Sequence, residues 1–343
     1  MTIIPAINTL DDVRHIVGGL PGPDDGAAAQ ARAREPLLTK PAGALGRLEQ
    51  LTEWLSAWQG RHPPGIAKTT AQVFAGTHGV TGRGVSAYPA EVTAQMVANF
   101  DAGGAAVNQL CQLFDVEFGV HALRLDQPTR DFVDAPAMEE SECIEAIAIG
   151  LNSVDDGSDL LCVGEMGIGN TTAAAALSHA LYGGSAADWT GPGTGVDGDA
   201  LDIKIKAVTD AVRLHRASAS DPFELLRRLG GRELAAIAGA LIGARLNRVP
   251  VLLDGFVSTA AAAVLEAYQP GALDHCQVGH VSPEPGHRLL IERLGKQPLL
   301  NLQMRLGEAS GAVMAVAVVK AAVSCHVGMA TFADARVADK ARG

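Results

Sequence analysis

A carboxylate inside a glycine-rich turn is the feature of this sequence that most suggests chemistry. The apolar run 160–163 leads into residues 164–172, Gly-Glu-Met-Gly-Ile-Gly-Asn-Thr-Thr, and then into an alanine-rich segment, which predicts a strand, a turn and a helix. Glycines let a backbone approach a ligand closely, and the free N–H groups at a helix start bind anions. Because the carboxylate of Glu165 would repel a phosphate, we expect it to face a ribose hydroxyl or a developing cation. The turn predicts a nucleotide site, although a purely structural strand-to-helix connection has the same pattern.

Several common catalytic motifs are missing from the sequence. The glycines of the turn are not followed by the Lys-Ser or Lys-Thr of a P-loop, which disfavours a small-molecule kinase, and their spacing is not G-x-G-x-x-G. No G-x-S-x-G elbow of a serine hydrolase occurs. The spacing of His280 and His287 matches no zinc pattern, and no cysteine cluster accompanies them, so we expect no metal site.

Polar residues follow another predicted strand, 70–75. Ser86, Tyr88 and Gln95 come shortly after it, where a flat aromatic guest can lie between apolar walls while a hydroxyl or an amide fixes its orientation. Such residues are also ordinary components of loops. The pattern favours an aromatic-base site without requiring one.

Two lysines lie near the start of a long predicted helix, 199–218. Lys204 and Lys206 are two residues apart, so they point to different faces, and at most one of them reaches a common phosphate. The alternative is that both are solvated lysines on an exposed helix.

These residues need a scaffold that brings several strand ends together. About six apolar runs alternate with helical segments, which predicts an α/β fold with a mostly parallel, Rossmann-like sheet covered by helices on both faces. The ends of such strands share one edge, where ligands bind. We expect an N-terminal helical lobe over 1–65, an α/β catalytic core over 66–310, and a C-terminal helix over 311–343 that completes the small lobe.

Composition limits the range of partners. The 343-residue chain is 48% hydrophobic, has a net charge of −11 and contains only 4% aromatic residues, which argues against a nucleic-acid surface. Its five cysteines are scattered singly, as reduced thiols in a cytosol would be. The apolar run 311–319 ends at Lys320, too short to span a membrane, and residues 1–10 lack a signal-peptide pattern. We therefore expect a cytoplasmic protein that binds small molecules rather than nucleic acid or membrane.

Seven motifs lie in order along nearly the whole chain, at 40–49, 76–80, 84–89, 164–172, 253–256, 279–287 and 305–308. Most of them fall at predicted strand ends. Together they resemble the nicotinate-nucleotide:dimethylbenzimidazole phosphoribosyltransferase family of cobalamin lower-ligand assembly.

The resemblance implies transfer of the 5-phosphoribosyl group of nicotinate mononucleotide to 5,6-dimethylbenzimidazole, with inversion at the sugar carbon and no metal or redox cofactor. It implies that Glu308 is the general base and that Glu165 lies near the sugar. The implied pocket for the aromatic base comprises Ser86, Tyr88, Gln95 and Leu306. The implied phosphate and ribose side comprises Gly167, Gly169, Asn170, Thr171, Lys204 and Ser282. The family also suggests a homodimer. A non-catalytic nucleotide sensor, or a phosphoribosyltransferase for a different aromatic base, remains the alternative.

Overall fold

Five parallel strands form one sheet at the centre of the molecule. The computed structural model describes residues 6–155 and 157–338. Within them the strand order is β2-β1-β3-β4-β5, and every neighbouring pair is parallel. The strands are β1 (Thr69–Ala75), β2 (Val116–Ala122), β3 (Leu160–Met166), β4 (Val251–Leu253) and β5 (Cys276–Val278). The predicted mostly parallel α/β fold is confirmed.

The strand order places a topological switch point between β1 and β3. The chain proceeds from β1 outward to β2, then returns to the other side of β1 to form β3 and continues through β4 to β5. Connections leave the two sides of the switch in opposite directions, which opens a crevice outside the carboxyl ends of β1 and β3. The glycine-rich turn that follows β3 lies at this edge.

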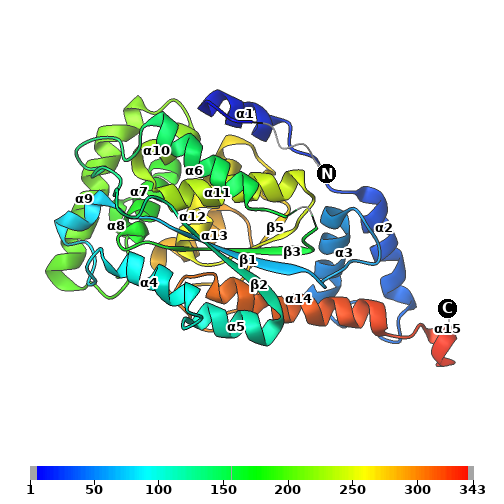
Figure 1. Cartoon of the computed structure of the whole chain (residues 1–343). Helices are drawn as coiled ribbons and strands as arrows, with labels where there is room; N and C mark the ends of the chain where they lie inside the picture. The colour runs from blue at the N-terminus through cyan, green and yellow to red at the C-terminus, as the bar shows by residue number, and fades with distance from the viewer. Residues whose placement is uncertain (1–5, 156, 339–343) are drawn as a thin grey trace.

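Helices cover both faces of the sheet, as Figure 1 shows, with α6 and α11 on one face and α5 and α14 on the other. Their bounds, in chain order, are α1 (Leu10–Gly18), α2 (Asp25–Arg34), α3 (Arg47–Gln59), α4 (Val92–Asp101), α5 (Ala106–Phe114), α6 (Glu140–Asn152), α7 (Asn170–Tyr182), α8 (Ala186–Trp189), α9 (Gly198–His215), α10 (Pro222–Leu229), α11 (Arg232–Leu246), α12 (Phe256–Tyr268), α13 (Pro285–Arg293), α14 (Ser310–Gly328) and α15 (Phe332–Ala335). Short 3₁₀ turns occupy Glu35–Leu37, Gly79–Arg83 and Arg216–Ser218.

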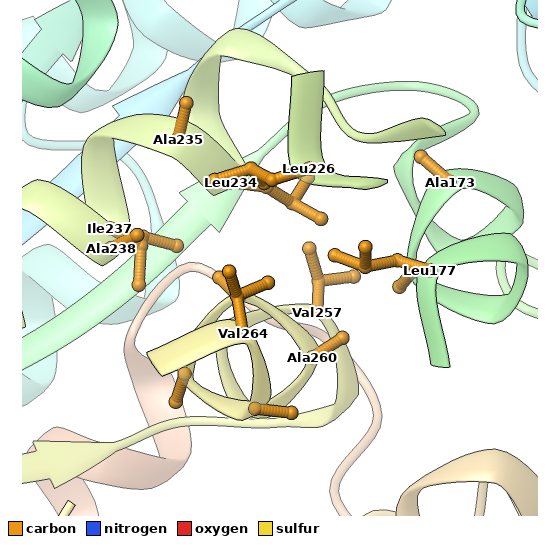
Figure 2. Packing of buried hydrophobic residues seen from close by; sticks show 14 of the residues in the cluster. Ala173, Leu177, Leu226, Leu234, Ala235, Ile237, Ala238, Val257, Ala260 and Val264 are labelled. Atoms are coloured by element: carbon orange, nitrogen blue, oxygen red, sulfur yellow. The ribbon is translucent and has the colours of Figure 1, made fainter. Parts of the chain in front are cut away.

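The larger apolar core lies between the sheet and the helices α6, α7, α10, α11 and α12. Figure 2 shows part of it, where Leu226 of α10 and Leu234 of α11 point toward Val257 and Val264 of α12. These side chains are almost completely buried. Burial of this apolar surface, worth roughly 25 cal/mol per Å², fixes the helices against the sheet.

The opposite face of the sheet packs against α3, α5 and α14. Ala71 and Val73 of β1 point to this face and join Val313 and Val316 of α14 in a second apolar cluster. Among the described residues, α14 is the one helix long and apolar enough to cross a membrane, but half of that apolar stretch is buried inside the protein. Apolar residues of α14 pack in this second core.

One local expectation differs from the structure. The apolar runs predicted about six strands, but the segment around Leu300 forms only a single parallel bridge to His280 within the described residues. It then turns away, with Gln303 in the left-handed region at φ 57°. The segment 102–105, which contains Gly103 at φ 76°, separates α4 from α5.

Candidate active site

A cavity of about 360 Å³ opens at the carboxyl edge of the sheet, beside the switch point. It receives residues from the loops after β1, β3, β4 and β5 and from the turn before α14. Eight of the twelve residues predicted for the site line it: Tyr88, Glu165, Gly167, Asn170, Thr171, Ser282, Leu306 and Glu308. Its volume is within the range usual for small-molecule sites.

Two carboxyl groups, from Glu165 and Glu308, share this cavity because the turn before α14 packs directly on β3. The backbone N–H of Glu308 donates to the carbonyl oxygen of Glu165 at 3.2 Å. Gly164 makes this approach possible, since a Cβ at that position would lie 2.0 Å from the backbone nitrogen of Ala309. Glu308 and Ala309 both have left-handed backbone angles, with φ of 63° and 60°. Such angles are rare for residues other than glycine and concentrate at functional sites.

Both carboxyl groups hold their protons more tightly than usual. Burial raises the pKa of Glu165 to about 8, and the nearby charges of Asp254, Glu233 and Glu308 add to the effect. Burial, followed by the charge of Asp254, raises the pKa of Glu308 to about 7. Burial disfavours the charged form of a carboxyl group, and neighbouring negative charges do the same. These are values suited to proton transfer near neutral pH.

The side chains at the start of α7 serve the cavity rather than the helix cap. The N-cap of α7 is Gly169, and the described residues provide no side-chain cap. The amide of Asn170 instead donates to the Glu165 carboxylate. The hydroxyl of Thr171 accepts a hydrogen bond from Lys204 Nζ at 2.8 Å.

Lys204 is almost completely buried directly behind the cavity wall. Besides its contact with Thr171, its ammonium group donates to the carbonyl oxygen of Gly191 at 3.0 Å. Burial lowers the pKa of Lys204 to about 8, partly offset by the negative charge of Glu284. A buried ammonium group with one N–H still available can attract an anion. Lys206, in contrast, is exposed and pairs with Asp210.

A glycine-rich segment, 191–195, covers this lysine, and side chains from two other loops hold it. Glu284 Oε1 accepts from the N–H of Gly193 at 2.9 Å, and Arg305 Nη1 donates to the carbonyl oxygen of Gly193 at 3.3 Å. Glu284, Arg305 and His280 all line the cavity, although the sequence pattern assigned no role to Glu284 and Arg305. For Glu284 the available signal was its position in a Ser-Pro-Glu-Pro loop after a strand.

The other four predicted residues, Ser86, Gln95, Gly169 and Lys204, lie around the cavity without lining it. The Ser86 hydroxyl is 3.2 Å from the hydroxyl of Thr194, which lines the cavity. Gln95 is exposed on α4. A Cβ at Gly169, whose φ is 92°, would lie 2.8 Å from Thr81 Cγ2 and so would point at the loop after β1.

Three histidines near the cavity have different surroundings. His287 Nδ1 accepts a hydrogen bond from Ser282 N–H, and His287 Nε2 lies 3.1 Å from Thr259 Oγ1. Burial lowers the pKa of this histidine to about 3. His78 pairs with Glu233. Only His280 of these three lines the cavity. In the part of the chain that the structure describes, no three His, Cys, Asp or Glu residues are grouped to hold a metal ion.

Comparison with known proteins gives the family. A family model described as phosphoribosyltransferase matches residues 20–337. The chain belongs to this family. It is 57% identical over 330 residues to a protein of Sinorhizobium medicae strain WSM419 named nicotinate-nucleotide-dimethylbenzimidazole phosphoribosyltransferase, covering 96% of this chain and 97% of the relative. A relative of the same name from Methylocella silvestris is 56% identical over 334 residues, covering 97% of this chain and 98% of the relative.

Solved structures of this phosphoribosyltransferase family have the same fold. The crystal structure of CobT from Thermus thermophilus superposes with a TM-score of 0.86 at 42% identity, covering 93% of this chain and all of that one. A second structure from the same organism, titled with the full phosphoribosyltransferase name, gives 0.85 at 40% identity, covering 92% of this chain and all of that one. The family membership expected from the seven motifs is confirmed, and the chain is a transferase.

Proposed function

We propose that this phosphoribosyltransferase moves the 5-phosphoribosyl group from nicotinate mononucleotide to 5,6-dimethylbenzimidazole, giving α-ribazole 5′-phosphate and nicotinate. The observation that carries the proposal is the pair Glu165 and Glu308, two carboxyl groups of raised pKa in one cavity, with the buried ammonium group of Lys204 bonded to Thr171 of the cavity wall. The names of the relatives support the same reaction.

The nucleotide occupies the side of the cavity next to α7. Its phosphate lies against the turn that contains Gly167 and Thr171, where the helix N-terminus, Lys204 and the Ser282 loop supply positive potential and N–H donors. The ribose faces Glu165. Positive charge develops on the sugar ring as the bond to nicotinate breaks, and a nearby carboxylate stabilises that charge.

The aromatic base occupies the apolar side. Tyr88, Met96 and Leu306 line that wall of the cavity together with Val92 and Ile168. Apolar and aromatic walls accept a flat ring, and a small number of polar groups then set its orientation. We assign this role to Ser86, whose hydroxyl is 3.2 Å from that of Thr194 in the cavity wall, and to Gln95, which precedes Met96 of the wall on α4.

Glu308 acts as the general base in this proposal. One nitrogen of the benzimidazole attacks C1′ from the face opposite to nicotinate, which inverts that carbon, and the bonding electrons of the old C–N bond leave with nicotinate. The other benzimidazole nitrogen still carries a proton, which the Glu308 carboxylate accepts. General-base catalysis of this kind contributes about 10²–10⁴-fold.

We also propose that the enzyme is a cytoplasmic homodimer. Tyr88 and Leu306 are 54% and 55% exposed at the mouth of the cavity, an unusual position for large apolar side chains that a second subunit would cover. Light scattering behind a sizing column measures the oligomeric state, and a monomer at micromolar concentration would contradict the dimer.

The first experiment is incubation of the protein with nicotinate mononucleotide and dimethylbenzimidazole, with nicotinate and α-ribazole 5′-phosphate followed by chromatography and mass spectrometry. Both products should form in equal amounts. Nucleotide binding without product would favour a sensor. Product formation only with adenine or another aromatic compound offered in parallel would favour a transferase for a different base.

The rate should depend on pH through Glu308. The general base must be ionised, so kcat/KM for dimethylbenzimidazole at saturating nucleotide should rise with pH around a midpoint near 7, the raised pKa of Glu308. Glu308→Gln should remove this acidic limb, whereas His78→Gln, His280→Gln and His287→Gln, tested singly, should retain it. If one histidine substitution removes the limb while Glu308→Gln retains it, that histidine is the base.

A further inference from the structure

Asp254 connects the end of β4 to the helix that follows Glu308. The side chain is completely buried, and its Oδ1 accepts hydrogen bonds from the N–H groups of Gly311 at 2.7 Å and Ala312 at 3.0 Å. These are N–H groups of the first turn of α14, which begins at Ser310. The carboxylate of Asp254, which follows β4, therefore caps α14. The first N–H group that it binds lies two residues after Ala309, which with Glu308 forms the left-handed pair.

Only one oxygen of the Asp254 carboxylate, Oδ1, accepts the hydrogen bonds of the cap. Its Oδ2 is buried without a hydrogen-bond partner among the described residues. His280 Nε2 lies 3.4 Å from Oδ1, beyond good hydrogen-bond geometry, and the two ring nitrogens of His280 also lack a partner within the described chain. A helix cap needs only an oxygen acceptor, which Asn supplies without charge, and a buried charge is costly. The negative charge at this position therefore indicates an electrostatic role.

We propose that Asp254 is a positioning residue for Glu308: its hydrogen bonds to Gly311 and Ala312 fix the start of α14, and they hold a buried carboxylate beside the turn that carries Glu308. The proposal deepens the function proposed above and rests on Glu308 as the base. Two N–H donors and the positive end of the α14 dipole stabilise the charge of Asp254. This charge in turn opposes ionisation of any carboxyl group close to it.

The surroundings agree with this role. The charge of Asp254 is the largest contribution after burial to the raised pKa of both Glu165 and Glu308. A nearby like charge disfavours the ionised form of a carboxyl group. The titratable and charged groups near Asp254 and the two carboxyl groups come from every neighbouring element: Cys162 and Glu165 on β3, Glu233 on α11, His280 and Glu284 after β5, and Arg305 before α14.

The test separates the effect of the Asp254 charge from the effect of the hydrogen bonds by which Asp254 caps α14. Asp254→Asn keeps an oxygen that can accept from Gly311 and Ala312 but removes the charge, whereas Asp254→Ala removes both. Asp221→Asn is the control, because Asp221 Oδ1 also accepts from two N–H groups of a first helical turn, those of Phe223 and Glu224 in α10, and the residue does not line the cavity. Its other carboxylate oxygen pairs with Arg14. Two quantities are measured on the full-length enzyme: the pH dependence of kcat/KM for dimethylbenzimidazole, and the titration of the Glu308 carboxyl carbon by NMR on ¹³C-labelled protein, assigned with Glu308→Gln.

Asp254→Asn should move both midpoints about one pH unit lower, because removal of a like charge lets Glu308 ionise at lower pH. KM for nicotinate mononucleotide should change less than about threefold, and the thermal midpoint should remain near that of the wild type. Asp254→Ala should reduce kcat at every pH because the turn that carries Glu308 is no longer fixed, and Asp254→Asn should retain more activity than Asp254→Ala above pH 7.

Unchanged midpoints in Asp254→Asn, or an equal shift in Asp221→Asn, would overturn the proposal. The NMR titration needs no turnover, so it tests the link between Asp254 and Glu308 even if the transfer reaction itself is absent. In that case the proposed function fails and the electrostatic coupling stands. If the reaction proceeds and the Glu308 signal does not respond to Asp254→Asn, the proposed function stands and the positioning role fails.

Discussion

Replacement of Glu308 by Gln is expected to slow phosphoribosyl transfer by about 10²-fold or more while the protein stays folded and binds nicotinate mononucleotide. Gln has the size of Glu and adopts the left-handed backbone at φ 63° no less readily, so the turn before α14 keeps its shape. What it loses is the ability to accept the benzimidazole proton. The product would then be held as a cation, and the transition state that leads to it becomes less stable.

The measurement is kcat with both substrates saturating, alongside nucleotide affinity by calorimetry. Glu117→Gln is the control, because Glu117 is an exposed glutamate on β2 and does not line the cavity. Near wild-type turnover in Glu308→Gln would show that another group takes the proton. Loss of nucleotide affinity together with turnover would instead point to a role in binding.

Replacement of Lys204 by Met should raise KM for nicotinate mononucleotide by about 10- to 100-fold and change KM for dimethylbenzimidazole far less. A hydrogen bond to a charged group contributes about 1.5–3 kcal/mol, which sets this range. Met suits the site because Lys204 is only 1% exposed and its stem already lies among buried residues. Since burial lowers the pKa of Lys204 to about 8, nucleotide affinity in the wild type should also weaken as pH rises above 8.

Initial rates over a matrix of both substrate concentrations separate the two Michaelis constants. Lys206→Met is the matched control, because that lysine is two residues along the same helix and exposed. Equal increases in both Michaelis constants for Lys204→Met, or the same increase for Lys206→Met, would contradict the assignment of Lys204 to the phosphate site.

Much of the architecture could be predicted because it depends on local pattern. Each apolar run followed by glycine and polar residues indicated a buried strand with a loop at its carboxyl end, and parallel strands bring such ends to one edge. Glu308, in contrast, was assigned a role only by the family resemblance, and its contact with the backbone of Glu165 is seen only in the structure. The bridge at Leu300 failed to become a sixth strand because the chain turns away after one pairing, which the apolar pattern alone does not reveal.

Other features depend on contacts between distant segments. The burial of Lys204 requires Thr171 and Gly191 to converge on it from two loops, and helix periodicity says nothing of that. A Cβ at Gly169 would point toward Thr81 rather than into the cavity, and this direction depends on the local backbone angles, which the sequence does not reveal. The capping of α14 by Asp254 joins positions more than fifty residues apart, so the sequence placed Asp254 only within the motif 253–256.

The two carboxyl groups of raised pKa give the enzyme a trade-off between catalysis and resistance to alkali. Each binds its proton more tightly in the folded protein than in the unfolded chain, so their contribution to folding stability is fully present below the ordinary glutamate pKa of 4.5. It is lost as pH rises through about 7 for Glu308 and about 8 for Glu165. The ionised form that the proposed mechanism requires of Glu308 is thus the form that the unliganded fold tolerates least, and positive charge developing on a bound sugar would relieve the repulsion between the two carboxylates.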